Sequence, residues 1–313
     1  MKLKNIFSFR ALSCLTALFI FALSFICYPV GNTNAFNQAT GYMCFDSSTN
    51  KRTSYTLNSL VVDNNVVTRG GSVPENRIPD SDTSVVQLDT VGGTGFIIGN
   101  HLIATCAHAV YDRTNDKFFA QNGNFNIAIK DSNSNTIKNI SSNSSKMQFH
   151  VPSNYHDLKI SDAIDSYDYA LIYVEEDLSQ YGIFEVGVVT NDFLNNHCEI
   201  TTSGFPSQIN YDQTNVYGTR YKSVGNSEMY ISNKYFLTRK LRFASTNCTS
   251  GGNSGGPAYF TYNDYNDKTK NVVIGIVTGG TRNGDRYTGT SGVRVTTNIL
   301  HFFFNNQKIG VSD

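Results

Sequence analysis

Four glycines surround one serine in the segment Gly251–Pro257, and this segment restricts the local fold more than any other stretch of the chain. Glycine adopts backbone angles with positive φ and lets other atoms approach the main chain closely. The segment therefore predicts a tight turn and not the interior of a helix or strand. A turn through Gly252, Asn253 and Ser254 can point the N–H groups of Gly252 and Ser254 at one position. Taken alone, the segment also fits an ordinary glycine-rich hairpin.

The composition predicts a mostly β protein of one large or two modest domains. The 313 residues include 21 Phe, 18 Tyr and 25 Gly, and few stretches show a helical period. Basic and acidic residues balance at 25 each, which argues against a nucleic-acid partner. Apolar or alternating runs predict strands at 84–88, 92–100, 101–106, 124–130, 147–151, 169–174, 199–202, 217–224, 234–243, 257–262, 272–277 and 293–297. Residues 131–145 predict a solvated loop, and residues 298–308 predict a C-terminal helix.

The N-terminus, residues 1–35, has the pattern of a signal peptide. Three basic residues precede an uncharged apolar run over 11–30, and small or polar residues then lead to Ala35. This pattern predicts export with cleavage after Ala35. An uncleaved membrane anchor is the alternative, because the apolar run approaches the length that spans a membrane.

Residues 36–69 are polar and weakly patterned, and we interpret them as a propeptide. Exposed-looking junctions at 65–66 and 69–70 predict a mature chain that begins between Val66 and Gly70. An ordered N-terminal extension is the alternative interpretation of this segment.

Four cysteines follow the predicted signal peptide, namely Cys44, Cys106, Cys198 and Cys248. They allow three pairings, and the sequence does not choose among them. A core of this size does not need disulfides, so we do not expect an obligatory disulfide framework.

Ser254 is a candidate nucleophile, provided that a base takes its proton and donors stabilise the resulting oxyanion. His108 is the best candidate base among the six histidines. It follows a predicted strand and stands between two alanines, which leave its ring accessible. The base in turn needs an acid that fixes its tautomer. Asp168 directly precedes the apolar strand 169–174, where a carboxylate is costly unless it has partners.

Three motifs occur in the order His, Asp, Ser: Thr-Cys-Ala-His at 105–108, Asp-Tyr-Ala-Leu at 168–171 and Gly-Asn-Ser-Gly-Gly-Pro at 252–257. Together they resemble the trypsin-like serine peptidases of the chymotrypsin fold. The set is most similar to the secreted bacterial branch that includes the glutamyl endopeptidases. Asn76-Arg77 and Ile274-Gly275-Ile276 also resemble that branch.

The resemblance covers most of the chain after the predicted propeptide. It implies an all-β fold of two antiparallel β-barrels with a short C-terminal helix. The N-terminal barrel, 70–185, would carry the histidine and the aspartate. The C-terminal barrel, 186–313, would carry the serine and the substrate pocket.

The resemblance also implies roles for individual residues. His108 would act as general base and then general acid, Asp168 would orient it, and Ser254 would be the acylated nucleophile. The N–H groups of Gly252 and Ser254 would form the oxyanion hole. In the substrate-binding region, a hydroxyl at Thr278 would support the aspartate, and the backbone of Gly279 and Gly280 would pair with the substrate.

The residues expected around the substrate side chain depart from known specificities. Cys248 stands where trypsins have the aspartate that binds Lys and Arg, which removes the case for tryptic specificity. Val277 replaces a histidine with which glutamyl endopeptidases bind glutamate, whereas Thr249 matches a polar residue of that group. Arg294 would pair with Glu or Asp if it points into the pocket, and the pocket is neutral if it points to solvent. We favour the neutral pocket, because most arginines next to strands are solvated.

Two further departures concern activation and the cysteines. Asn253 stands where animal enzymes have an aspartate that captures a freed N-terminus, so that zymogen switch is absent. Neither Cys106 nor Cys248 is expected to contact the three catalytic residues.

The sequence thus predicts a secreted, extracellular serine endopeptidase that acts on proteins or peptides. We expect no metal or other cofactor, no nucleic-acid partner, no stable membrane association after signal cleavage, and a monomer. One alternative is a stress-type quality-control protease, which shares the motif at 252–257 but carries a C-terminal domain for which few residues remain. Another is a catalytically idle homologue that serves as a binding or toxin module, although such proteins usually lose a catalytic residue.

Overall fold

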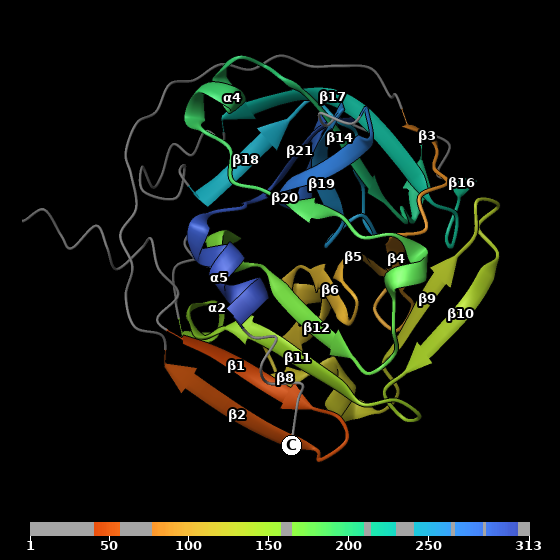
Figure 1. Cartoon of the computed structure of the whole chain (residues 1–313), viewed down its shortest axis with the longest axis vertical. Helices are drawn as coiled ribbons and strands as arrows, with labels where there is room; N and C mark the ends of the chain where they lie inside the picture. The colour runs from red at the N-terminus through yellow and green to blue at the C-terminus, as the bar shows by residue number, and fades with distance from the viewer. Residues whose placement is uncertain are drawn as a thin grey trace, which may run out of the picture. The chain divides into compact units, whose positions relative to one another are not determined.

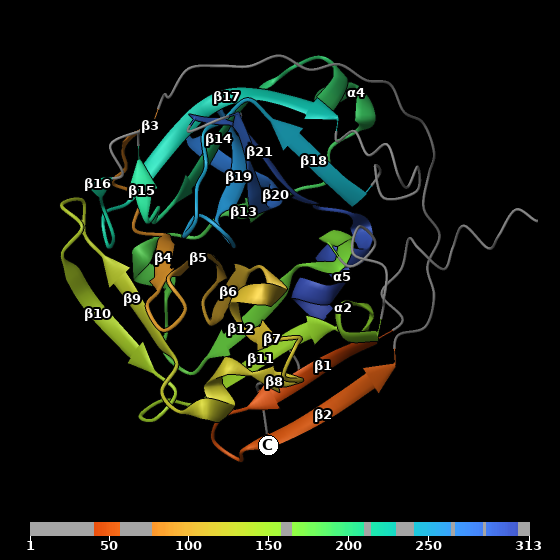
Figure 2. The same ribbon diagram turned by 180° about the vertical axis from the view of Figure 1, so that it is seen from behind.

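A computed structural model describes residues 41–56, 77–157, 165–209, 214–229, 241–263, 267–283 and 286–305, all within the unit Gln38–Asp313. Most of these residues form two large sheets (Figures 1 and 2). The predicted signal peptide lies outside the described residues. Within the described part, no helix is long and apolar enough to span a membrane.

The first sheet is open. Its neighbouring strands follow the order β10-β9-β4-β5-β6-β12-β11-β1-β2, and no pairing joins the two end strands among the described residues. The strands are β1 Gly41–Asp46, β2 Lys51–Thr56, β4 Val85–Leu88, β5 Gly93–Gly99, β6 Leu102–Thr105, β9 Asn126–Lys130, β10 Thr136–Ser141, β11 Met147–Pro152 and β12 Ala170–Val174.

The second sheet closes on itself. Its order is β13-β20-β19-β14-β17-β18-β21, with β3 beside β17, and β20 also pairs with β21, which completes a closed barrel. The strands are β3 Arg77–Pro79, β13 Glu185–Val186, β14 Glu199–Gly204, β17 Tyr221–Met229, β18 Arg242–Ser245, β19 Pro257–Asn263, β20 Thr269–Asn283 and β21 Arg286–Arg294. The predicted all-β fold is confirmed, with one closed barrel and one curled, open sheet.

Short elements complete the fold. The helices are α2 Ser153–Asp157, α4 Asn191–Asn195 and α5 Thr297–Asn305, and the remaining short strands are β7 Tyr111–Asp112, β8 Lys117–Phe118, β15 Gln208–Ile209 and β16 Thr214–Asn215. The predicted C-terminal helix is therefore present as α5. Its apolar face buries Ile299, Phe302 and Phe303, and the Phe302 ring packs edge-on against Tyr169 at 5.1 Å.

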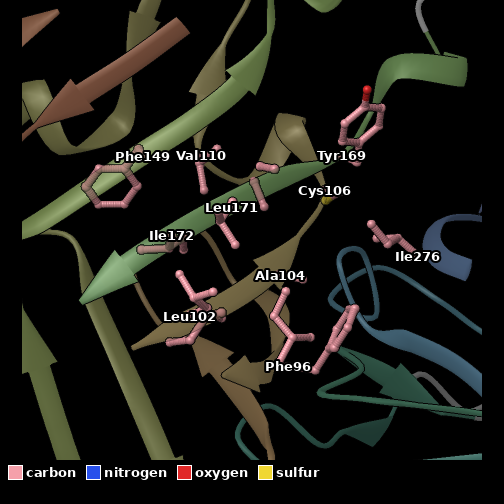
Figure 3. Packing of buried hydrophobic residues seen from close by; sticks show 14 of the residues in the cluster. Phe96, Leu102, Ala104, Cys106, Val110, Phe149, Tyr169, Leu171, Ile172 and Ile276 are labelled. Atoms are coloured by element: carbon pink, nitrogen blue, oxygen red, sulfur yellow. The ribbon is translucent and has the colours of Figure 1, made fainter. Parts of the chain in front are cut away.

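The core of the first sheet continues into the second. Figure 3 shows Leu102 and Ala104 of β6 beside Leu171 and Ile172 of β12, with Ile276 of the second sheet close by. All five side chains are almost fully buried. At about 25 cal/mol per Å² of apolar surface, burial of this kind is the main term that stabilises the two sheets. One apolar cluster therefore includes residues of both sheets.

Two sequence predictions need correction. Residues 131–145, predicted as a loop, contain the strand β10, of which only Ile140 is buried. Such polarity suits an edge strand, which faces solvent and avoids pairing with other molecules. The sequence indicated a loop at 281–291, but these residues belong largely to the long hairpin of β20 and β21.

The segment predicted as a weakly patterned propeptide contains an ordered hairpin. Strands β1 and β2 pair with each other, and β1 also pairs with β11 of the first sheet. The ordered conformation of residues 41–56 therefore fits the alternative interpretation, an ordered N-terminal extension. The predicted cleavage junctions at 65–66 and 69–70 lie outside the described residues.

Candidate active site

His108 and Asp168 hold each other through two hydrogen bonds. The backbone N–H of His108 donates to Asp168 Oδ1 at 2.9 Å, and the imidazole Nδ1 lies 2.7 Å from Oδ2. Asp168 is only 5% exposed, so these two donors replace the water that burial removes. With the proton on Nδ1, the other ring nitrogen, Nε2, is left to accept a proton.

Strands β6 and β12 bring the two residues together. Thr105, the last residue of β6, pairs with Ala170, the first residue of β12. A single 3-10 turn, Ala107–Ala109, follows β6 and presents His108. Asp168 lies just before β12, so the pair forms where these neighbouring strands meet. The sequence prediction placed both residues at these strand ends.

The turn around Ser254 requires glycine at two positions. Gly252 has a φ of 91° and Gly255 a φ of 87°, in the region that other residues rarely adopt. A Cβ on Gly252 would lie 2.2 Å from the Phe205 carbonyl oxygen, and one on Gly255 would lie 2.1 Å from the Thr94 carbonyl oxygen. The tight turn predicted from the glycines is present, and both conformation and space exclude a side chain.

Thr94 of β5 ties the serine turn to the first sheet. Its N–H donates to the Ser254 carbonyl at 2.9 Å, and its own carbonyl accepts the Thr105 hydroxyl at 2.7 Å. Thr105 ends the strand that leads to His108, so this chain of bonds brings the serine and histidine segments to one place. Sequence reasoning missed Thr94, because a threonine within a strand carries no signature of such a role.

The Nε2 atom of His108 contacts Cys106 and not Ser254. The Cys106 Sγ lies 3.5 Å from Nε2, and among the described residues no hydrogen bond joins Ser254 to His108. Cys106 is fully buried, and burial raises the pKa of its thiol. The prediction that Cys106 stays away from the catalytic residues is therefore wrong. The 3-10 turn folds the imidazole back over the residue two positions earlier, which the sequence does not reveal.

The environment of His108 favours its protonated form. Burial of the ring alone would lower the pKa of His108, but the charges of Cys106 and Asp168 and its hydrogen bonds to both outweigh burial. The pKa of His108 is therefore raised well above its usual value. The carboxylate of Asp168 is the cause that persists when the buried thiol is neutral.

Two backbone donors beside the serine are unused. The N–H groups of Gly252 and Ser254 donate to no acceptor within the described part of the chain. By contrast, the N–H of Gly255 donates to the Val277 carbonyl at 2.7 Å. Unused donors at a turn are available for a developing negative charge, as an oxyanion hole requires.

The comparison with protein families decides the classification. The trypsin-like peptidase domain family matches residues 93–264, more than half of the chain. The chain belongs to this family. No curated protein was found to match the chain.

A solved structure supports the fold of this trypsin-like peptidase. The structure of a Glu endopeptidase in complex with MPD matches with a TM-score of 0.54 and 21% sequence identity. The match covers 75% of this chain and 97% of that chain. At this identity the likeness establishes the chymotrypsin-type fold, in agreement with the resemblance found in the sequence.

Threonine hydroxyls gather where the peptidase is expected to bind the substrate side chain. Thr249 Oγ1 lies 2.7 Å from Thr290 Oγ1, and Thr290 donates to the Asn247 carbonyl at 2.8 Å. A Cβ on Gly280 would lie 2.3 Å from the Thr249 carbonyl oxygen, so the Gly279–Gly280 backbone passes directly against Thr249. Thr290 was missed, because it belongs to the segment 281–291, which the sequence indicated as a loop.

Cys248 and Val277 are each only 1% exposed. Both side chains are uncharged, so neither offers a charge to a substrate. The absence of the trypsin aspartate at Cys248 and of the glutamyl-endopeptidase histidine at Val277 therefore leaves these two positions neutral.

Arg294 points neither into the substrate-binding region nor to solvent. It is 8% exposed, and its guanidinium donates to Asn191 Oδ1 at 2.5 Å and to the Val189 carbonyl. Both alternatives considered for Arg294 are therefore wrong. Arg294 of β21 pairs with Gly275 of β20, and from this position its side chain reaches the segment that leads into α4.

A different arginine lies beside the strand expected to bind substrate. Arg242 donates to Thr278 Oγ1 and to Ser291 Oγ, both at 3.3 Å, and forms an ion pair with Asp165 at 3.1 Å. Thr278 makes no hydrogen bond to Asp168 among the described residues. The Thr278 hydroxyl, which was expected to support Asp168, thus accepts a hydrogen bond from Arg242 instead. Arg242 was not among the residues predicted from the sequence.

Cys106, His108 and Asp168 also carry atoms that bind metals, and these atoms lie within 4.8 Å of one another. However, the imidazole Nδ1 and the Asp168 carboxylate already bond to each other, which leaves only Sγ and Nε2. A zinc site uses at least three protein ligands. The arrangement is therefore better suited to proton transfer than to holding a resident metal.

Proposed function

We propose that this peptidase is exported and hydrolyses peptide bonds by a Ser-His-Asp acyl-enzyme mechanism. The observation that carries the proposal is the doubly hydrogen-bonded pair of His108 and Asp168, tied through Thr94 to the glycine turn of Ser254. Each element of this arrangement has a chemical task in acyl transfer.

The first half of the reaction forms the acyl-enzyme. Ser254 Oγ attacks the scissile carbonyl while His108 Nε2 takes its proton, for which the ring must exchange its Cys106 contact for Ser254. Asp168 keeps Nδ1 protonated and stabilises the imidazolium. His108 then gives the proton to the leaving amine, and the peptide bond breaks.

The second half repeats the sequence with water as the nucleophile. His108 takes a proton from water, the hydroxide attacks the acyl carbonyl, and the proton returns to Ser254 as the acid product leaves. In both halves the N–H groups of Gly252 and Ser254 donate to the oxyanion. One such donor is typically worth a factor of about 10² to 10³ in kcat.

The substrate-binding region favours uncharged side chains at the cleaved position. The hydroxyl hydrogens of its threonines are already engaged, since Thr290 donates to the Asn247 carbonyl and Thr249 donates to Thr290, and Cys248 and Val277 offer no charge. Arg242 is already paired with Asp165 and buried to 5% exposure. A preference for glutamate would need a free cation here, so we propose a neutral pocket for medium apolar or uncharged polar side chains.

Export and processing complete the proposal. The signal peptide 1–35 directs the chain out of the cell, and cleavage between Val66 and Gly70 gives the working form. N-terminal sequencing of the secreted, active protein tests this step. An active form whose only N-terminus is Phe36 would contradict the cleavage.

Matched peptides with Gln, Leu, Glu and Lys at the cleaved position test the activity and its specificity together. We expect hydrolysis of the Gln and Leu peptides, and no hydrolysis by Ser254→Ala prepared in parallel. A kcat/KM for Glu more than about a hundredfold above that for Gln would contradict the neutral pocket, since a buried charge pair is worth that much.

A further inference from the structure

The hairpin formed by β1 and β2 fills an edge of the first sheet that would otherwise be open. β11 pairs with β12 on one side and with β1 on the other, over five residue pairs from Tyr42–Pro152 to Asp46–Gln148. Without the hairpin, β11 would present unpaired backbone N–H and C=O groups along this length. Such an edge promotes association with other chains.

The apolar residues of β1 belong to the core. Met43, Cys44 and Phe45 are at most 5% exposed. The Phe45 ring stacks on Phe118 at 5.7 Å and lies 6.2 Å from Phe149. A propeptide that is released easily would have to expose all of these rings, so its departure would cost the free energy of burying them.

Arg52 of β2 fastens the hairpin from a second direction. Its guanidinium donates to Asp116 Oδ1 at 2.7 Å and to Met43 Sδ at 2.9 Å, and it lies 5.5 Å from the centre of the Tyr111 ring. The Tyr111 hydroxyl also donates to Asp116. The hairpin therefore contacts the loop between β7 and β8, which follows the 3-10 turn of His108.

The hairpin thus supports both candidate catalytic residues of the first sheet. Tyr111 and Phe118 begin and end the loop that follows His108. On the other side, β1 pairs with β11, β11 pairs with β12, and Asp168 immediately precedes β12. None of these contacts uses a residue between 57 and 76, so they do not depend on the covalent link to the rest of the chain.

We propose that the hairpin, residues 41–56, is a permanent part of the working peptidase and stays bound to β11 after the chain is cut between residues 56 and 77. The mature enzyme is then a complex of two chains held without a disulfide, since the four described cysteines are free. The importance of the hairpin for catalysis rests on the proposed function, whereas its retention does not.

The test is to cut the full chain at a chosen place and to ask whether the hairpin leaves. Residues 66–70 are replaced by the recognition sequence of a site-specific protease, and the cut protein is passed over a size-exclusion column under native conditions. Mass spectrometry then identifies the chains in each fraction. We expect the N-terminal fragment to co-elute with the body and to separate only in denaturant. Separation under native conditions would overturn the proposal, whether or not the body keeps its activity.

Two variants and one control sharpen this test. Phe45→Ala removes the buried ring and should increase the dissociation constant of the fragment at least about a hundredfold, given the usual cost of such a truncation. Arg52→Ala should weaken retention about threefold to tenfold and leaves the core intact. Lys51→Ala removes an exposed cation from the same strand, with no partner in the described residues, and should change nothing. If Lys51→Ala released the fragment as readily as Phe45→Ala, retention would not depend on the core contacts of the hairpin, and the proposal would be overturned.

Because retention is read by mass, a chain without peptidase activity would still report on it. Loss of the proposed function and loss of the hairpin are therefore distinguishable outcomes.

Discussion

The two sheets are completed in different ways. The second closes through its own strands β20 and β21, whereas the open edge of the first is covered by a hairpin from the N-terminal segment. The sequence stretch that matches the peptidase family, 93–264, includes no residue of that hairpin. The sheet that carries the serine is thus closed by its own strands, whereas the sheet that carries His108 and Asp168 depends on the β1–β2 hairpin to cover its edge.

The two sheets also hold their catalytic candidates differently. The position of Ser254 follows from backbone geometry, since two glycines adopt angles and approaches that no other residue allows. His108 and Asp168 are held by side-chain bonds at the ends of two strands. The turn of Ser254 should be insensitive to changes at the distant edge of the first sheet. The strand ends that hold His108 and Asp168 belong to that sheet and should move with it.

The largest effect should come from removing either catalytic side chain. Ser254→Ala and His108→Ala remove groups from different sheets that the proposed mechanism uses in one reaction, so each should lower kcat by about 10⁴ to 10⁶ and leave the fold intact. Single-turnover hydrolysis and circular dichroism check both points. A His108→Ala enzyme with more than about a tenth of the normal rate would contradict the assignment.

Truncation of a buried phenylalanine should affect the two sheets differently, depending on which region carries the substitution. Phe45→Ala in the hairpin and Phe243→Ala in a smaller apolar cluster within the second sheet each delete a buried ring, and each should reduce the free energy of unfolding by about 3–5 kcal/mol. Native-state hydrogen exchange should show faster local opening of β11 and β12 in the first variant only. Equal acceleration in β19 and β20 would mean that the hairpin does not act on the first sheet in particular.

The raised pKa of His108 predicts a shifted pH profile. The base must be unprotonated to accept the serine proton, so kcat/KM should rise with pH through a midpoint above about 6.5, the ordinary histidine value. Conversely, the protonated ring stabilises the fold at low pH, and this contribution is lost as pH rises through the raised pKa. Asp168→Asn should lower the pKa of His108, measured by NMR titration. An unchanged value would contradict Asp168 as its cause.

The smallest effect should come from the Cys106 contact. The Cys106 Sγ contacts His108 Nε2, the nitrogen that must accept the proton of Ser254, but a thiol is a weak hydrogen-bond donor. Cys106→Ala should therefore change kcat/KM by less than about tenfold, whereas Cys106→Ser should keep the contact. A hundredfold loss in Cys106→Ala would instead show that the thiol positions the base.

The sequence predicts the features of this site that depend on local pattern. The glycines around Ser254 prescribe their turn, and a histidine and an aspartate at strand ends can be found because the apolar runs mark those strands. Arg294 shows the limit, because a strand alternates its faces at every residue and an uncertain register leaves the direction of a side chain open. Cys106 and Thr94 depend on a turn and on contacts between distant strands, and neither leaves a local signal.

The hairpin shows why the rest could not be predicted. Residues 41–56 carry few apolar positions, so they look like a polar propeptide. Their order comes from a partner strand about a hundred residues away, whose open edge no local pattern reveals. A signal was nonetheless present, since Asp46–Asn50 is rich in turn residues and Asn50 adopts a positive φ of 51° between the two strands.

The central claim is that Ser254 is a nucleophile activated by His108. A fluorophosphonate probe reacts with such a serine, and mass spectrometry of the digested protein locates the adduct. We predict one adduct on the peptide that contains Ser254, absent from Ser254→Ala and strongly reduced in His108→Ala. An unlabelled Ser254 in the folded, processed protein, or equal labelling in His108→Ala, would contradict the claim.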